Sequence, residues 1–256
     1  MTGLSARLDK ATVLDEMAAT AWPALETENL NGWRLRHTPD SLIRRCNSVL
    51  CNRVENNAVL ADMIDRAEKF YRARHIAPRF QISPASQPGD LDRELEKRGY
   101  ITEAPSMVMT TEGLASNPPK TSPDPATTSP VMDEGWLDCY LGEVPDQQQR
   151  QGRENILRSI QGEKIFAKIN PDNKTRASGL AVINQTFCGI FCMHTLQPDR
   201  SQGLGKRILK RLMHEAFQLG ARTIYLQVQS DNVRGLEFYR HCGFKTAYGY
   251  HYRTLE

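Results

Sequence analysis

The region after residue 130 alternates between two hydrophobic patterns. Apolar residues recur every three or four positions in one set of segments, which predicts amphipathic helices at 133–144, 147–160, 202–220 and 233–243. Apolar and polar residues alternate in a second set, rich in branched and aromatic side chains, which predicts strands at 163–170, 177–185, 187–196, 223–229 and 244–255. A helix joins two of these strands, so we expect an α/β fold whose sheet is parallel or mixed.

A proline-rich segment divides the chain. Five prolines fall between residues 113 and 130, separated by Ser, Thr and Asn, with almost nothing to bury. This composition is typical of an extended linker. We therefore predict a linker at 113–129 between an N-terminal part, 1–112, and a C-terminal part, 130–256, each of ordinary domain size.

Composition narrows the class of protein. The 256 residues carry 33 basic and 30 acidic side chains, a net charge of +3, which argues against a nucleic-acid partner. The first residues lack the apolar core of a signal peptide, and no apolar run approaches the roughly 18 residues of a membrane span. We therefore expect a cytoplasmic protein with no membrane partner. The six cysteines form no C-x-x-C pair, so we expect free, mostly buried thiols and no metal site.

The stretch QPDRSQGLGKR, 197–207, joins a predicted strand to a predicted helix with small residues and cations. The first N–H groups of a helix lack internal partners and lie at the positive end of its dipole, so they can hold an anion. Gly203 and Gly205 carry no Cβ to keep a diphosphate away, and Arg200 and Lys206 add positive charge. A tight turn is the structural alternative. The G-x-G-x-x-G dinucleotide fingerprint fails because residue 208 is Ile, and the P-loop pattern also fails.

Two motifs together resemble a known family. R-x-x-G-x-G runs from Arg200 to Gly205, and N-x-x-G-x-x-F-Y-x-x-x-G-F runs from Asn232 to Phe244. This combination resembles the GNAT superfamily of acyl-CoA-dependent N-acyltransferases, and the resemblance covers residues 130–256. One departure is the loop from Pro198 to Arg200, which is a residue shorter than the family's common P-x-x-R spacing.

The resemblance implies acetyl-CoA as co-substrate and no metal. Amides of the glycine loop would hold the pyrophosphate of coenzyme A, and its pantetheine arm would pair with the end of the preceding strand. The implied coenzyme-binding residues are Met193, His194, Thr195, Leu196, Arg200, Ser201, Gln202, Gly203, Leu204, Gly205, Lys206 and Asn232. Tyr239 matches the family's general acid.

Acyl transfer to an amine needs a proton donor and a proton acceptor. A tyrosine with an ordinary pKa near 10 can protonate a leaving thiolate, although Tyr239 could instead only pack beside Phe238 and Phe244. The predicted strand 187–196 has no carboxylate to serve as base. His194 lies in this strand and could accept a proton directly or through water, or be a structural histidine.

The N-terminal part is a weak sequence repeat of the C-terminal part. APRFQIS at 77–83 matches ARTIYLQ at 221–227, and KRGY matches HCGF, each 144 residues later. With this offset, Gly203, Gly205, Asn232 and Tyr239 correspond to Val59, Ala61, Pro88 and Leu95. We therefore expect tandem GNAT-like domains, each a mixed, mostly antiparallel sheet flanked by helices, with an N-terminal domain that lacks the coenzyme motif.

The sequence leaves three alternative functions for the protein. The first is an N-acetyltransferase for a small-molecule or amino-acid-like amine, with the acceptor pocket between the two domains. The others are a non-catalytic acyl-CoA sensor and a protein lysine acetyltransferase, which would need an acidic acceptor groove. Intact Tyr239 favours an enzyme over a sensor. In the N-terminal part, an acceptor cleft or a domain interface could use Trp33, Arg34, Arg36, Arg44 and Arg45, although a solvated basic face is the more ordinary interpretation of these arginines. The protein could also form a homodimer.

Overall fold

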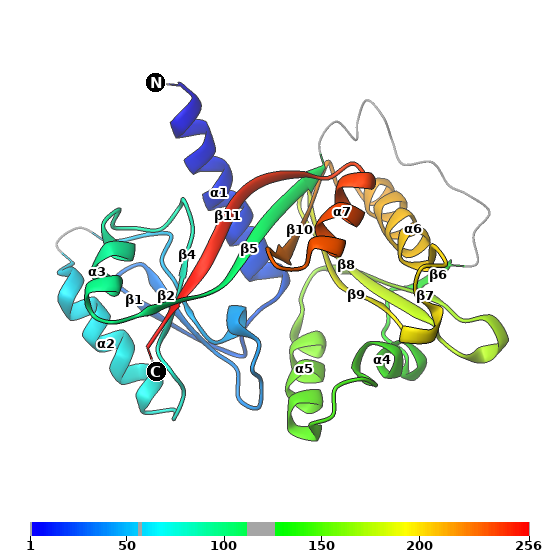
Figure 1. Cartoon of the computed structure of the whole chain (residues 1–256), viewed down its shortest axis with the longest axis horizontal. Helices are drawn as coiled ribbons and strands as arrows, with labels where there is room; N and C mark the ends of the chain where they lie inside the picture. Colours follow the sequence, from blue (N-terminus) through cyan, green and yellow to red (C-terminus); the bar gives the residue numbers. More distant parts are fainter. Residues whose placement is uncertain (1, 56–57, 112–125, 256) are drawn as a thin grey trace.

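The computed structural model describes residues 2–55, 58–111 and 126–255, with side chains from residue 10 onward (Figure 1). The helices are α1 (Thr2–Ala21), α2 (Leu60–Arg72), α3 (Leu91–Lys97), α4 (Glu134–Leu141), α5 (Gln147–Ser159), α6 (Leu204–Gln218) and α7 (Val233–His241), with short 3-10 turns η1 (Arg44–Cys46), η2 (Pro171–Asn173) and η3 (Gln197–Asp199). The strands are β1 (Glu26–Leu30), β2 (Trp33–His37), β3 (Val49–Leu50), β4 (Arg79–Ile82), β5 (Ile101–Thr111), β6 (Ala126–Ser129), β7 (Glu163–Ile169), β8 (Ala177–Asn184), β9 (Phe187–Thr195), β10 (Thr223–Gln229) and β11 (Lys245–Thr254).

Every helix and strand expected after residue 130 is present, with ends that differ by a few residues. The elements that were not expected include α1 and β6, and β6 pairs with β7 at the end of the proline-rich segment. Residues 112–125, most of the predicted linker, lie outside the described residues. As expected, the six cysteines are free thiols, four of them buried.

The described strands form one mixed sheet in the order β1-β2-β3-β4-β11-β5-β10-β9-β8-β7-β6. Most neighbours are antiparallel. The parallel pairs are β3 with β4, joined through α2, and β9 with β10, joined through α6. This confirms the expected mixed sheet and the helix crossover between residues 191 and 228, because parallel neighbours need a long connection.

The two halves of the chain repeat the same order of elements. Adding 144 to the bounds of α2, 60–72, gives 204–216, and α6 spans Leu204–Gln218. The same shift carries α3 onto 235–241, within α7, and β5 onto 245–255, beside the bounds of β11. The repeat found from short sequence matches therefore extends over whole elements.

The last strand of each half lies between the two halves. β5 pairs with β10, β11 pairs with β4, and these two long strands pair with each other, all antiparallel. In Figure 1 they run across the middle of the molecule. The pair Ile101–Thr254 becomes the pair Lys245–Thr110 under the 144-residue shift. Each half therefore completes the sheet of the other.

Helices cover both faces of the C-terminal sheet. On one face, α6 and α7 bury Ile208 and Leu236 in a cluster that includes Ala181 of β8. On the other, α4, α5 and α1 bury Trp136 beside Val182, the next residue of β8. Seven of the eight residues of β8 are therefore buried, as in strands covered on both sides. α1 belongs to the N-terminal half but contacts β8 and β9.

A buried carboxyl joins three elements where the halves meet. Asp15 of α1 is 1% exposed, and it accepts hydrogen bonds from Ser83 after β4 and from Tyr248 of β11, both at 2.6 Å. Burial outweighs these hydrogen bonds and raises the pKa of Asp15 from 3.8 to about 6. The pKa in the folded state lies above the pKa in the unfolded state. The stabilisation from protonated Asp15 is therefore present below pH 3.8 and is lost as the pH rises through about 6.

We predict that Asp15→Asn removes this pH dependence. Between pH 4 and pH 7 the free energy of unfolding of the wild type should fall by about 2 kcal/mol relative to that of the variant. Urea denaturation of both proteins at pH 4, 5, 6 and 7 measures this difference. A constant difference across these pH values would contradict the prediction.

Candidate active site

Two neighbouring strands separate at the site. β9 pairs with β10 only where residues 187–189 face residues 223–225. Beyond this point β10 keeps its pairing with β5, and β9 keeps its pairing with β8. A cavity of about 330 Å³, which we call the inner cavity, is lined by residues 190–193 of β9 and residues 226–227 of β10. The divergence of the strands therefore creates room in the middle of the sheet.

A β-bulge shapes the β9 side of this gap. Leu180 of β8 faces Phe191, but Ser178 faces His194, so Cys192 and Met193 together oppose the single residue Gly179. Cys192 has a φ of 52°, in the left-handed region. A bulge takes backbone groups out of the ladder and leaves them for another partner. A Cβ on Gly179 would lie 2.6 Å from Ile208 Cγ2 and 2.8 Å from Met193 Sδ, so this position needs glycine.

A second cavity, of about 530 Å³, lies at the start of α6, and we call it the helix-end cavity. Most residues proposed from the sequence line it: Met193, His194, Thr195, Arg200, Ser201, Gly203, Leu204, Gly205, Lys206, Asn232 and Tyr239. Leu196 and Gln202 lie next to these residues in the chain but do not line the cavity. Asp199, Arg234, Gly235 and Phe238 complete the lining. The two sequence motifs thus meet in one place.

The N-terminus of α6 presents free backbone donors. Gly203, the N-cap, has a φ of 78° and supplies no side-chain cap, so the first N–H groups of α6 keep no intrahelical partner. A Cβ on Gly205 would lie 3.8 Å from Thr195 Oγ1 and from Phe238 Cζ, and all three residues line the cavity. Arg200 is held at the entrance, because its Nε donates to the Thr195 carbonyl at 3.0 Å. This arrangement can bind an anion.

Asn232 is the N-cap of α7. Its Oδ1 accepts a hydrogen bond from the Gly235 N–H at 2.9 Å and so caps α7. The cap fixes the direction in which α7 leaves the loop after β10, and α7 carries Tyr239. Asn232 therefore positions the tyrosine, besides lining the helix-end cavity.

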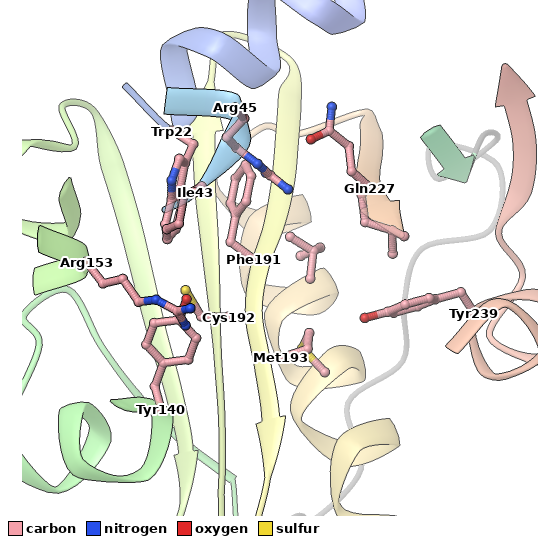
Figure 2. Close-up of a pocket in the computed structure, with 12 residues that line it drawn as sticks. Trp22, Ile43, Arg45, Tyr140, Arg153, Phe191, Cys192, Met193, Gln227 and Tyr239 are labelled. Carbon is pink, nitrogen blue, oxygen red and sulfur yellow. The ribbon is translucent and has the colours of Figure 1, made fainter. Parts of the chain in front are cut away.

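Tyr239 lines both cavities, together with Met193. Its ring contacts Phe238 and Phe244 in edge-to-face geometry, with centroids 5.0 and 5.9 Å away. Burial raises the pKa of Tyr239 to about 12, so its hydroxyl keeps its proton at neutral pH. Figure 2 shows the hydroxyl pointing into the inner cavity, where it can donate a hydrogen bond or a proton.

His194 lies beside the bulge and lines the helix-end cavity. Its Nε2 is 3.5 Å from Glu143 Oε2, at the end of α4, and makes no hydrogen bond. Burial lowers the pKa of His194 from 6.5, more than the nearby Glu143 carboxylate raises it. The ring is therefore neutral near pH 7, and one ring nitrogen can accept a proton.

The inner cavity combines side chains of both halves (Figure 2). Trp22, Ile43 and Arg45 come from the N-terminal half, and the others are Tyr140, Arg153, Ile190, Phe191, Cys192, Met193, Leu226, Gln227 and Tyr239. Arg45 was a candidate from the sequence, whereas Tyr140, Arg153 and Gln227 were not. The alternation of β10 could have pointed to Gln227, since Ile224 and Val228 pack in the cluster that includes the buried residues of α6.

Comparison with known proteins now gives the family. Residues 11–253 match the family described as "Probable histone acetyltransferase Rv0428c C-terminal". The chain belongs to this family. It is also 25% identical to the "Uncharacterized N-acetyltransferase YobR" of Bacillus subtilis (strain 168), over 96% of this chain and 99% of that protein.

Solved structures agree on the fold. A GCN5-related N-acetyltransferase from Kribbella flavida is similar with a TM-score of 0.69 and 13% identity, over 95% of each chain. A tandem GNAT protein from the clavulanic acid biosynthesis pathway is similar with a TM-score of 0.65 and 11% identity, over 95% of this chain and 87% of the other. The protein is thus an N-acetyltransferase of the GNAT type, and the resemblance seen in the two motifs is confirmed.

A membrane-spanning helix and a metal-binding cluster are both absent from the described residues. Among residues 2–55, 58–111 and 126–255, no helix is long and apolar enough to cross a membrane. Within the same described part of the chain, no three His, Cys, Asp or Glu side chains are grouped so that they could hold a metal ion.

We predict that Gly179→Ala destabilises this GNAT protein by about 1–3 kcal/mol, because the added methyl overpacks the contact with Ile208 and Met193. Gly205→Ala is the matched control. Its Cβ has no neighbour closer than 3.8 Å and lies within α6, so stability should stay equal or rise. Chemical denaturation measures both, and a Gly179→Ala protein as stable as the wild type would refute the tight contact.

Proposed function

We propose that the protein transfers the acetyl group of acetyl-CoA to the amine of a small-molecule acceptor. The supporting observation is that the helix-end cavity and the inner cavity share Met193 and Tyr239. Acetyl-CoA would occupy the first and the acceptor the second, so the thioester and the amine would meet beside the bulge of β9. Bringing both reactants together supplies much of the rate enhancement.

The N-terminus of α6 supports binding of coenzyme A. In this proposal the N–H groups that follow Gly203 hold the diphosphate, and Lys206 and Arg234 add positive charge in the same cavity. Arg234 is already oriented toward the loop, since its guanidinium donates to Ser201 Oγ at 2.8 Å. The pantetheine arm would run along Met193 to Thr195, where β9 has no partner on its β10 side.

Acyl transfer forms a carbon–nitrogen bond and breaks the carbon–sulfur bond of the thioester. The amine must be neutral to attack, and His194, with its lowered pKa, is the proposed acceptor of the amine proton, directly or through water. A backbone N–H released by the bulge would stabilise the negative charge on the carbonyl oxygen. Tyr239, protonated at neutral pH, would give its proton to the leaving thiolate.

A small acceptor is favoured over a lysine of a protein. The family description names histone acetyltransferase, and a lysine-rich tail would need acidic residues around its charge. The inner cavity instead contains Arg45 and Arg153, and among the described residues no Asp or Glu lines it. Its volume of about 330 Å³ lies at the small end of ligand pockets.

The coenzyme site is tested with Gly205→Glu. The new carboxylate would enter the helix-end cavity and occupy the anion position, so the affinity for coenzyme A should fall at least about 10-fold. The control is Gln218→Glu, which adds the same charge at the far, exposed end of α6. Calorimetry with coenzyme A measures both variants. Unchanged affinity in Gly205→Glu would remove the diphosphate from this helix end.

Tyr239→Phe tests the proposed acid. Because a positioned general acid contributes about 10²–10⁴-fold, kcat should fall by about 100-fold, while the affinity for coenzyme A stays unchanged. Release of free thiol from acetyl-CoA measures kcat across a panel of amines, and calorimetry measures the affinity. Full turnover by this variant would leave Tyr239 only its packing role against Phe238 and Phe244.

A further inference from the structure

Two arginines line the inner cavity without any carboxylate partner among the described residues. Arg45 lies in η1 of the N-terminal half, and Arg153 lies in α5 of the C-terminal half. Their neighbours in the chain do have such partners. Arg44 forms an ion pair with Glu103, and Arg150 lies 3.9 Å from Asp138. The two positive charges at the cavity are therefore left uncompensated.

Both arginines are partly buried, and the guanidinium of Arg45 lies against aromatic rings. Arg45 lies over the ring of Phe191 at 5.7 Å and over that of Trp22 at 6.0 Å. Arg153 is half-buried, and its Nε is buried with no hydrogen-bond acceptor. Figure 2 shows Arg153 entering the cavity from the side opposite Tyr239. A buried donor without an acceptor costs free energy, and an anionic ligand that accepts its hydrogen bond would offset that cost.

The acidic residue next to this region, Glu103, is already paired with other arginines. A larger cavity of about 860 Å³, which we call the outer cavity, shares Ile43, Arg45 and Arg153 with the inner one. In the part of the chain that the structure describes, no Asp or Glu lines either cavity. Arg44 and Arg79 also line the outer cavity, but Glu103 pairs with both of them. Arg45 and Arg153 therefore lie at the border between the two cavities, and neither forms an ion pair among the described residues.

We propose that the acceptor is an amine that also carries a carboxylate, and that Arg45 and Arg153 bind this carboxylate. The inference rests on the proposed function and specifies its substrate class. The anion would sit at the border between the inner and outer cavities, and the amine would point toward Met193 and Tyr239. Arginine presents a planar fork of donors that matches a carboxylate, so this recognition orients the amine as well as attracting the molecule.

The substrate class is tested with matched acceptors. A panel of amino acids is compared with the same compounds as carboxamides and as aminoalkyl phosphonates, and release of free thiol from acetyl-CoA is measured. We expect kcat/KM for the best carboxylate to exceed that of its carboxamide at least about 10-fold, as for a hydrogen bond to a charged group. Equal use of the carboxamide, or better use of the phosphonate, overturns the carboxylate assignment.

The two arginines are tested with Arg45→Met and Arg153→Met. Each should raise KM for the carboxylate about 10- to 100-fold, with little change for the carboxamide. Arg158→Met is the matched control, because Arg158 lies on the same helix, α5, and its side chain is 65% exposed in a pair with Glu154. If either cavity variant loses the same factor on both acceptors, or if neither loses activity, the assignment of these residues is wrong.

Binding separates this inference from the proposed function. Calorimetry of the wild type saturated with coenzyme A measures the affinity for the carboxylate amines, and the two cavity variants are measured in the same way. Arginine-dependent binding without thiol release would overturn the proposed reaction but support the carboxylate site. Thiol release with amines that carry no carboxylate, at equal efficiency, would support the reaction and overturn the carboxylate site.

Discussion

The pairing of β5 with β11 is the interaction on which the rest of the structure depends. Each of these strands ends one half of the internal repeat, and each extends the sheet of the other half. Their hydrogen bonds join two short sheets into one and bring the N-terminal half against the C-terminal one. Because ladder hydrogen bonds fix register, the exchange also fixes where Trp22 and Arg45 lie relative to β9.

The site lies beside the strand that the exchange places in the middle of the sheet. β10 pairs with β5 from Ile224 to Gln229 on one edge, whereas on its other edge β9 leaves it after Gly189. The bulge at Cys192 and Met193 turns the freed part of β9 toward the start of α6. A cavity in the middle of a well-packed sheet therefore arises from backbone geometry, while Gly179 gives the bulge the space it needs.

The two halves differ at the positions of the coenzyme motif. At the position that corresponds to Tyr239, the N-terminal half has Leu95, a fully buried residue of α3, and at the position of Gly203 it has Val59. Its packing is therefore that of a closed core, with Trp33 and Phe80 between the sheet and its helices. What this half contributes to the site is the wall of the inner cavity, through residues that have no role in the repeat itself.

The sequence by itself determined the elements of the C-terminal half, the family and the helix-end cavity. These depend on neighbours in the chain: the amphipathic period of α6, the positive φ of Gly203 and the spacing from Arg200 to Gly205. Only the tertiary structure decided the exchange of β5 and β11, the packing of α1 on β8 and β9, and the meeting of Arg45 with Arg153. The polar edge strand β6 could not be predicted from the sequence either. It is held by backbone hydrogen bonds with β7 and by the burial of Ala126, and neither produces a hydrophobic pattern along the chain. Contacts between residues a hundred positions apart depend on which strands pair. Local periodicity predicts the strands themselves but not their pairing.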